Sequence, residues 1–195
     1  MFWWLASALT VQDMLSYPIT YSPFSFAHAV WDAHHHDDAF VTCRLRGAVC
    51  EDPTSRLFLM GPDFVRFRNE FEAVLALELT GRLLYHDHAE PDLDFSNVTD
   101  ARTGVRVSGM LKATKWPVRP TVEMIGAVVA VWADETAMRT GAQLDMVEVW
   151  ESSRSGAMLD RDGIDGAHGI VQRWFGTTTP SADSDAAAFS AFAAG

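Results

Sequence analysis

Hydrophobic side chains between Gly61 and Gly81 recur at the spacing of one helix face. A helix completes a turn in about 3.6 residues, so apolar residues three or four apart line one side of it. The start at Pro62 is typical of a first helical turn, which tolerates proline, and Gly81 is typical of a helix end. We therefore predict an amphipathic helix with this buried face: Phe64, Phe67, Phe71, Val74 and Leu75.

Alternation of apolar and polar residues predicts strands before this helix. Residues 40–46 alternate at a period of two, which places successive side chains on opposite faces of a strand, and residues 56–60 are a second strand candidate. Residues 47–53 between them are rich in turn formers. We therefore expect an antiparallel hairpin that precedes the helix.

A second alternating pair follows the helix at residues 92–98 and 105–114, around a turn at 99–104. Together the patterns predict an α+β fold, in which an antiparallel sheet carries the central amphipathic helix on one face. We expect the aromatic helix face to lie against the strands that contain Leu93, Phe95, Val105, Val107 and Val128.

Residues 122–132 are apolar on every side, which suits either a central strand or a buried helix of the same length. Residues 137–150 predict a moderately amphipathic helix. With these elements the core domain extends over residues 40–151. Residues 152–176 read as a loop-rich extension, and the Ala-rich residues 177–195 read as a mobile tail.

Residues 1–39 are predicted to be an aromatic segment that docks on the core domain. Trp3 and Trp4 begin a short helical pattern, and their indoles either pack on the core or are displayed to a partner. Further along, residues 27–40 contain three consecutive histidines, and neighbouring residues in a helix or strand cannot all aim at one point. We interpret this stretch as a polar loop or helix surface.

The charge of the chain limits its partners. Asp and Glu number 26 against 15 Lys and Arg, a net charge of −11. Nucleic acid and anionic membranes are therefore disfavoured, and a basic protein partner is favoured. The first basic residue is Arg44, so the N-terminus lacks the pattern of a secretory signal, and we predict a cytoplasmic protein. Cys43 and Cys50 are either reduced thiols or a short-range pair.

One short segment has the spacing of a metal site. His86 and His88 would point the same way from a strand, Glu90 would continue that face, and His35 could complete the ligand set. The alternative is a polar strand end without a metal. Residues 160–166 read as a solvated turn, because the glycine and glutamate positions of a calcium loop are not met. Familiar nucleophile and phosphate-loop motifs do not occur, so no catalytic residue is assigned.

The element order from Phe40 to Trp150 resembles the layout of small immunity proteins of bacterial polymorphic toxin systems. The resemblance rests on hairpin, helix, acidic turn, hairpin, apolar segment and helix in succession, and on the acidity of the chain. It implies a bacterial inhibitor that docks on a protein. It has no diagnostic residue motif, so no functional residue is carried over.

Two hypotheses for the function follow. The first is an acidic protein-binding module of the inhibitor or immunity type, which needs no cofactor and is not an enzyme. The second is a small enzyme that uses one divalent transition metal at His86 and His88. The sequence favours the first, because charge and architecture extend over the whole chain, whereas the metal pattern is local.

Overall fold

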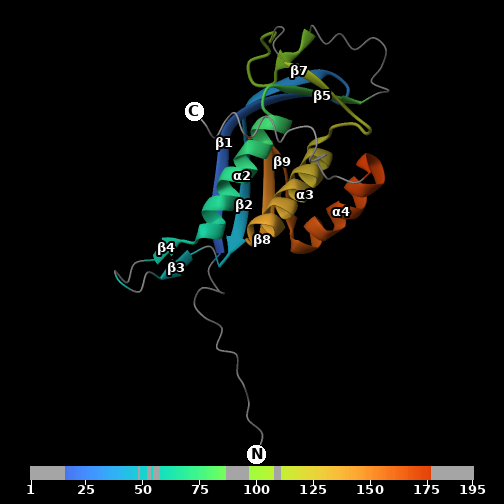
Figure 1. Ribbon diagram of the computed structural model, residues 1–195. Coiled ribbons are helices and arrows are strands. Elements are labelled where there is room, and N and C mark those ends of the chain that lie inside the picture. The colour runs from blue at the N-terminus through green and yellow to red at the C-terminus, as the bar shows by residue number, and fades with distance from the viewer. Residues whose placement is uncertain are drawn as a thin grey trace, which may run out of the picture.

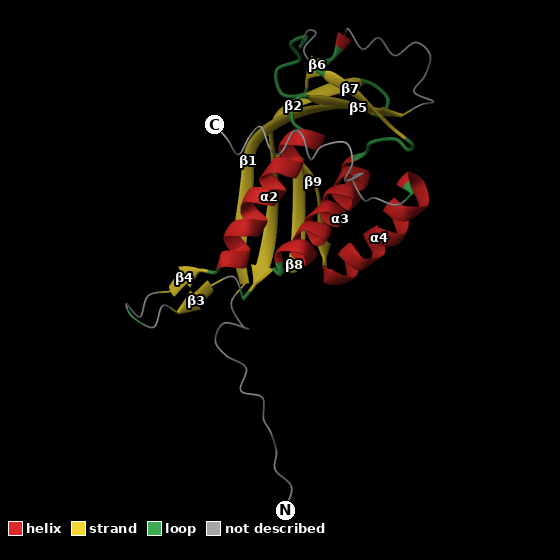
Figure 2. Cartoon of the chain, in the orientation of Figure 1, coloured by secondary structure: helices red, strands yellow, loops and turns green. Residues whose placement is uncertain are grey.

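The chain adopts an α+β fold in which helices cover one face of a mostly antiparallel sheet (Figures 1 and 2). The predicted fold class is therefore confirmed. The computed structural model describes residues 16–47, 49–51, 54, 58–86, 97–107 and 111–176. Within these residues no helix is both long enough and apolar enough to cross a membrane.

Antiparallel pairing joins four strands, β1 (Ser16–Ala29), β2 (Ala33–Arg46), β8 (Gln143–Ser152) and β9 (Ser155–Asp160). The sheet continues beyond β1 through two parallel strands, β5 (Arg82–His86) and β7 (Lys112–Trp116). Its order is β7-β5-β1-β2-β8-β9, and β6 (Thr99–Asp100) pairs with β2. A separate hairpin consists of β3 (Val49–Glu51) and β4 (Phe58–Met60).

The helices are α2 (Pro62–Glu78), α3 (Val122–Thr140) and α4 (Arg161–Phe175). They lie in front of the antiparallel strands in Figure 1, with α3 between α2 and α4. The main hydrophobic core fills the space between this helix layer and the sheet. The other face of the sheet carries a smaller cluster around Ala27, Ala33 and Leu83.

Helix α2 confirms the prediction made from its periodicity. It begins at Pro62, and Phe64, Phe67, Phe71 and Leu75 are all buried, with Val74 partly buried beside them. Beyond the end of the helix, Gly81 has a φ of 69°. This left-handed conformation favours glycine, because glycine has no Cβ to clash with the backbone.

The residues that pack against α2 differ in part from the expectation. Val128 is buried in the same core, but it belongs to α3 and not to a strand. Val105 is 64% exposed. The chain there forms a turn around Asp100, whose carboxylate accepts hydrogen bonds from the backbone amides of Arg102 and Thr103. Residues 92–96 lie outside the described residues.

Residues 122–132 form the first part of helix α3, so the helix alternative is correct and the central strand is wrong. The hydroxyl of Thr121 caps the start by accepting from the amide of Met124, and Gly141 ends the helix with a φ of 80°. Because α3 is covered by the sheet and by both neighbouring helices, apolar residues are stable on nearly every side of it. This position explains why no single hydrophobic face is visible in the sequence.

The predictions for residues 137–176 were largely wrong. The expected helix over 137–150 is instead the end of α3 followed by strand β8, and the expected linker after residue 151 is the turn of the β8–β9 hairpin. The residues read as a solvated turn begin α4, where the carboxylate of Asp160 accepts from the amide of Gly163. Aspartate and glycine suit a helix cap as well as a loop, which explains the error.

The N-terminal part of the chain also folds differently. Residues 16–29 form β1, and the histidine-rich stretch belongs to β2 rather than to a loop or helix surface. Pro23 lies where the β1–β2 register shifts between Tyr21 and Phe24, and an irregular position of this kind tolerates proline within a strand. The expected pairing of residues 40–46 with 56–60 was wrong, because β2 pairs with β1 and β8, and β4 pairs with β3.

Several earlier expectations concern residues that the structure does not describe. They are the placement of Trp3 and Trp4 and the tail 177–195. Cys43 is free and completely buried, and burial raises the pKa of its thiol well above the usual value. This environment makes Cys43 an inert core residue, because the reactive form of cysteine is the thiolate.

Candidate metal centre

The β1–β2 hairpin places two histidines on the helix-covered face of the sheet. Phe26 pairs with His36 and His28 pairs with His34, so these four side chains share one face. Phe26 belongs to the main core, which identifies that face as the one beneath the helices. His28 and His36 are diagonal neighbours across the two strands.

A carboxylate from β8 completes a group of three metal-ligating side chains. The Nε2 atom of His28 lies 3.1 Å from Nε2 of His36 and 3.1 Å from Oε2 of Glu151. One ligand atom from each residue lies within 4.8 Å of the other two. We find one group of three or more His, Cys, Asp or Glu side chains with converging ligand atoms among the described residues, and it is this one.

The backbone before α3 determines which ring nitrogen of His28 carries the proton. Its Nδ1 atom lies 2.7 Å from the carbonyl oxygen of Pro120, and a carbonyl can only accept, so Nδ1 donates. In the neutral ring Nε2 is then unprotonated and directs its lone pair at His36 and Glu151. Metal-binding histidines are commonly oriented in this way, with the second ring nitrogen donating to a carbonyl.

Burial and charge tune the other two members. His28 and His36 are both buried, and the Glu151 side chain is 14% exposed. Burial lowers the pKa of His36, and the neighbouring His28 ring lowers it further. Burial alone would raise the pKa of Glu151, but polar contacts with His28 and Ser155, and attraction to the two imidazoles in their protonated form, outweigh it, so this pKa is lowered. At neutral pH the site therefore offers an uncharged His36 and a carboxylate.

The Oε2 atom of Glu151 is buried and makes no hydrogen bond within the described part of the chain, although it is 3.1 Å from His28 Nε2. The short contact therefore lacks hydrogen-bond geometry. A buried carboxylate oxygen without a partner is costly, and a cation placed between it and the two imidazoles would satisfy it.

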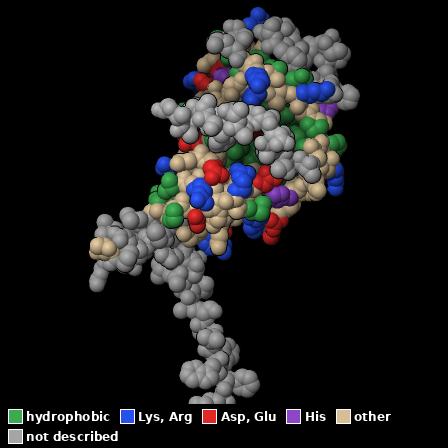
Figure 3. Space-filling model, viewed as in Figure 1, with side chains coloured by type: hydrophobic (Ala, Val, Ile, Leu, Met, Phe, Trp, Pro, Cys, Tyr) green, Lys and Arg blue, Asp and Glu red, His purple; other side chains and the backbone are tan. Residues whose placement is uncertain are grey.

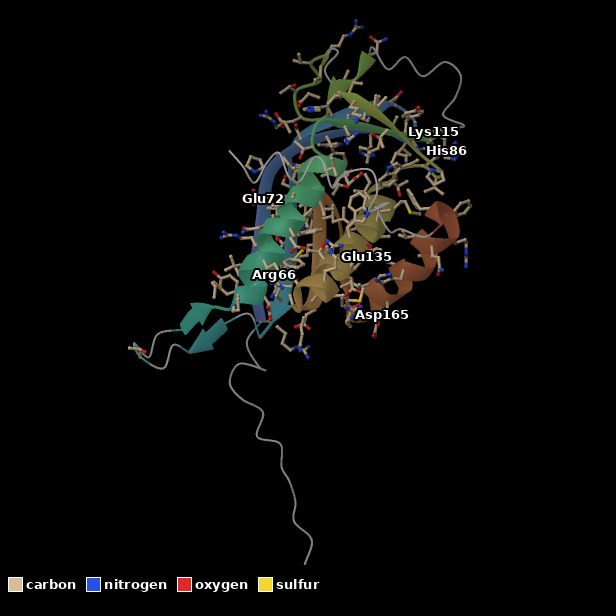
Figure 4. All side chains as sticks on the ribbon, in the orientation of Figure 1. Arg66, Glu72, His86, Lys115, Glu135 and Asp165 are labelled. Carbon is tan, nitrogen blue, oxygen red and sulfur yellow. The ribbon has the colours of Figure 1, made fainter. Side chains whose placement is uncertain are left out.

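Of the residues predicted from the sequence as metal ligands, His86 and His35 are described by the structure, and neither is a member of this group. His86 lies on β5, beside Lys115 in Figure 4, and its Nε2 donates to the carbonyl of Pro117 at 2.9 Å. His35 points to the other face of β2, where Nδ1 is 3.8 Å from Oδ2 of Asp100. His88 and Glu90 lie outside the described residues, so their role as ligands stays a prediction.

Sequence reasoning missed His28, His36 and Glu151 as a set. The stretch that holds both histidines was interpreted as a loop or helix, and in a helix His28 shares a face with His35 rather than with His36. A strand interpretation of residues 16–46 would have placed His34 and His36 on one face. The distance in sequence between His36 and Glu151 gave no comparable signal.

A second polar cluster joins α3 to α4. Asp134 on α3 is buried, and its carboxylate accepts from the guanidinium of Arg161 at 2.6 Å and from Nε2 of His168 at 2.9 Å. Arg161 also pairs with Asp165, one turn further along α4, which Figure 4 labels. These contacts satisfy the buried carboxylate, and we interpret the cluster as a structural tie between the helices.

Charges of both signs are mixed on the helix-covered side of the molecule. Figure 3 shows Lys and Arg side chains interspersed with Asp and Glu over the helices. The net negative charge of the chain is thus not gathered into one acidic patch in this view. The basic protein partner inferred from the composition stays a prediction.

Comparison with known proteins identifies a solved structure with a similar fold. No family model and no curated protein matches the chain. An uncharacterized protein from Wolinella succinogenes is similar over 75% of this chain and 99% of its own, with 18% identity and a TM-score of 0.50. This likeness shows a shared fold.

Two 6-pyruvoyl tetrahydropterin synthases match less closely. The Caenorhabditis elegans protein is 14% identical over 75% of this chain and 94% of its own, with a TM-score of 0.44. A catalytic-residue mutant of the Plasmodium vivax protein is 16% identical over 75% of this chain and 98% of its own, also with a TM-score of 0.44. No residue role is transferred from these structures to this chain.

Proposed function

We propose that the protein is a metal-dependent enzyme that binds one divalent transition metal ion through His28, His36 and Glu151. The observation that carries the proposal is the convergence of their three ligand atoms, with Nε2 of His28 directed inward by the Pro120 carbonyl. This replaces the ligand set expected from the sequence but keeps the chemistry, a histidine-based site for one divalent ion.

The spacing of the donors fits a metal ion of the size of zinc. Two ligands at about 2.0–2.1 Å from a tetrahedral zinc ion lie about 3.3–3.4 Å apart. The two measured separations from His28 Nε2 are both 3.1 Å, so small side-chain movements would accommodate the ion. Two neutral imidazoles and one carboxylate form a donor set that zinc and related ions accept.

Three protein ligands leave a coordination position for a water molecule or a substrate oxygen, which distinguishes catalytic from purely structural zinc sites. An ion held here would act as a Lewis acid on that oxygen. His34 pairs directly with His28, shares its face and is exposed. On the basis of this shared face we propose that His34 either joins the ligand set or exchanges protons with a bound group.

The acidic binding module remains the alternative function. It rests on the charge of the chain, and the resemblance to immunity proteins adds element order but no functional residue. The metal proposal is preferred because it rests on a defined arrangement of buried atoms.

The test is a zinc titration of protein prepared without an affinity tag and stripped with a chelator. We expect one equivalent to bind, and the His28→Ala and His36→Ala variants to lose at least about 100-fold in affinity, since changes even in the outer shell cost about 10–100-fold. His86→Ala is the matched control, because it removes a histidine from a strand of the same sheet that is not a member of the group.

Two outcomes would contradict the proposal. Absence of stoichiometric zinc, cobalt or manganese binding would leave His28 and Glu151 as a buried ion pair with a structural role. Equal loss of affinity in the His86→Ala variant would instead move the site towards the ligands predicted from the sequence.

A further inference from the structure

Trp31 and Arg119 form an exposed pair on two chain segments that also contribute to the candidate metal centre. The guanidinium carbon of Arg119 lies 4.1 Å from the centre of the Trp31 ring, and Trp31 is 68% exposed. Trp31 lies in the turn between β1 and β2, three residues after His28. Arg119 directly precedes Pro120, whose carbonyl accepts from His28. Both members are thus attached to segments that build the site.

Hydrogen bonds on both sides of Arg119 hold its backbone. His86 donates to the carbonyl of Pro117 at 2.9 Å, and His28 donates to that of Pro120 at 2.7 Å. The carbonyl of Arg119 itself accepts from the amide of Thr121 at 2.9 Å, where α3 is about to begin. Recognition groups on a backbone fixed in this way lose little entropy when they bind a ligand.

The stacking leaves the hydrogen-bonding edge of the guanidinium available. A guanidinium placed over an indole uses its flat face for the cation–π contact, whereas its N–H donors point outward in its own plane. Within the described ranges the structure gives Arg119 no carboxylate partner, while Arg46 and Arg161 are both paired. The chain has a net charge of −11, and an exposed arginine that lacks a carboxylate partner in such a chain can bind an external anion.

The charge of a metal ion bound at the candidate centre would also favour the binding of an anion. A divalent ion, the Glu151 carboxylate and two neutral imidazoles sum to one positive charge. Arg119 precedes the proline whose carbonyl accepts from His28, so a bound ion would add its positive charge to that of the guanidinium on the same segment, and positive charge of this kind attracts anionic ligands. Arginine also binds carboxylate and phosphate oxygens in a two-pronged manner that fixes their orientation.

We propose that Trp31 and Arg119 are the specificity element that recognises an anionic group, a phosphate or a carboxylate, on the substrate of the metal centre. The inference rests on the proposed function for the identity of the site. Arg119 would hold the anion, and Trp31 would hold the guanidinium in its binding orientation.

The experiment is a calorimetric titration of inorganic phosphate, and separately of oxalate, into zinc-loaded and zinc-free protein. In the loaded wild-type protein we expect binding that the Arg119→Gln variant weakens about 10-fold, the loss of one charge-assisted contact of about 1.4 kcal/mol. Arg119→Lys should lose less, because it keeps the charge, and Trp31→Ala should also weaken binding by releasing the guanidinium. A preference for phosphate or oxalate would identify the anion.

Arg66→Gln is the matched control, because it removes the same charge from an exposed position on α2, labelled in Figure 4. It should leave anion binding unchanged, and all these variants should bind zinc like the wild-type protein. Equal anion affinity in wild-type and Arg119→Gln protein, with zinc bound, would overturn this inference and leave the metal proposal intact.

The zinc-free arm separates the two proposals. If the wild-type protein binds no metal but still binds phosphate or oxalate through Arg119, the metal proposal fails and the anion site stands. If neither metal nor Arg119-dependent anion binding is measured, both are wrong.

Discussion

Replacement of Glu151 by glutamine tests the metal centre with the smallest structural change. The two side chains have nearly the same shape, so packing around β8 should be kept, while the negative charge and one strong metal ligand are lost. The carboxylate oxygen that lies 3.1 Å from His28 Nε2 becomes part of a neutral amide. The effect on metal affinity and the effect on metal-free stability then differ in size.

The loss of metal affinity should be larger than the change in the stability of the metal-free protein. Loss of an outer-shell partner lowers affinity about 10–100-fold, so loss of a direct anionic ligand should cost at least about 100-fold, or about 2.8 kcal/mol. In the metal-free protein Oε2 of Glu151 is buried and makes no hydrogen bond within the described residues, so the neutral amide removes an unpaired buried charge rather than a stabilising contact. We therefore expect the free energy of unfolding of the metal-free variant to stay within about 1 kcal/mol of wild type.

The assay pairs zinc competition against a chromophoric chelator with urea unfolding in excess chelator. Glu148→Gln is the control, because Glu148 lies on the same strand and the change removes the same charge. Its carboxylate faces Arg44 at 3.9 Å and is not part of the metal-ligand group. Zinc affinity within about threefold of wild type in Glu151→Gln, a difference of about 0.7 kcal/mol, would refute the assignment of Glu151 as a ligand.

Three further predictions concern stability. Phe71→Ala should cost about 3–5 kcal/mol in urea unfolding, because the ring is completely buried; a loss below about 1 kcal/mol would contradict the described core. Gly126→Ala should destabilise the protein by about 1–3 kcal/mol, although alanine has the better helix propensity, because a Cβ at residue 126 would lie 2.6 Å from the Cβ of Ala157. Gly169→Ala should instead stabilise the protein by about 0.5–1 kcal/mol, because a Cβ at residue 169 would meet open space. In the metal-free protein the lowered pKa of His36 contributes stability above about pH 6.5, and this stability is lost as the pH falls through the lowered pKa. The free energy of unfolding measured from pH 7 to 5 should therefore fall less steeply in His36→Gln than in the wild-type protein. Identical slopes of the free energy against pH would contradict this.

Local pattern was sufficient for α2. Its aromatic residues lie on one side because the helix has one neighbour layer and one solvent side, so the spacing in the sequence records the environment. Residues 40–46 were likewise recognised as a strand, since inward and outward positions alternate there.

Local pattern failed where tertiary contacts surround an element. Helix α3 is apolar on nearly all sides because it is enclosed, and a short apolar run is the same for a buried strand and a buried helix. For residues 161–175 the aspartates and glycines suited a loop, and the structure uses Asp160 as a helix cap.

The sequence by itself determined the α+β class, the amphipathic helix α2 and the presence of histidines and carboxylates that can bind a metal. Only the tertiary structure decided which of them meet. His28 and His36 become neighbours through the β1–β2 register, and Glu151 joins them because β8 pairs with β2. Strand pairing brings together residues that are far apart in the chain, and no periodicity within one segment carries that information.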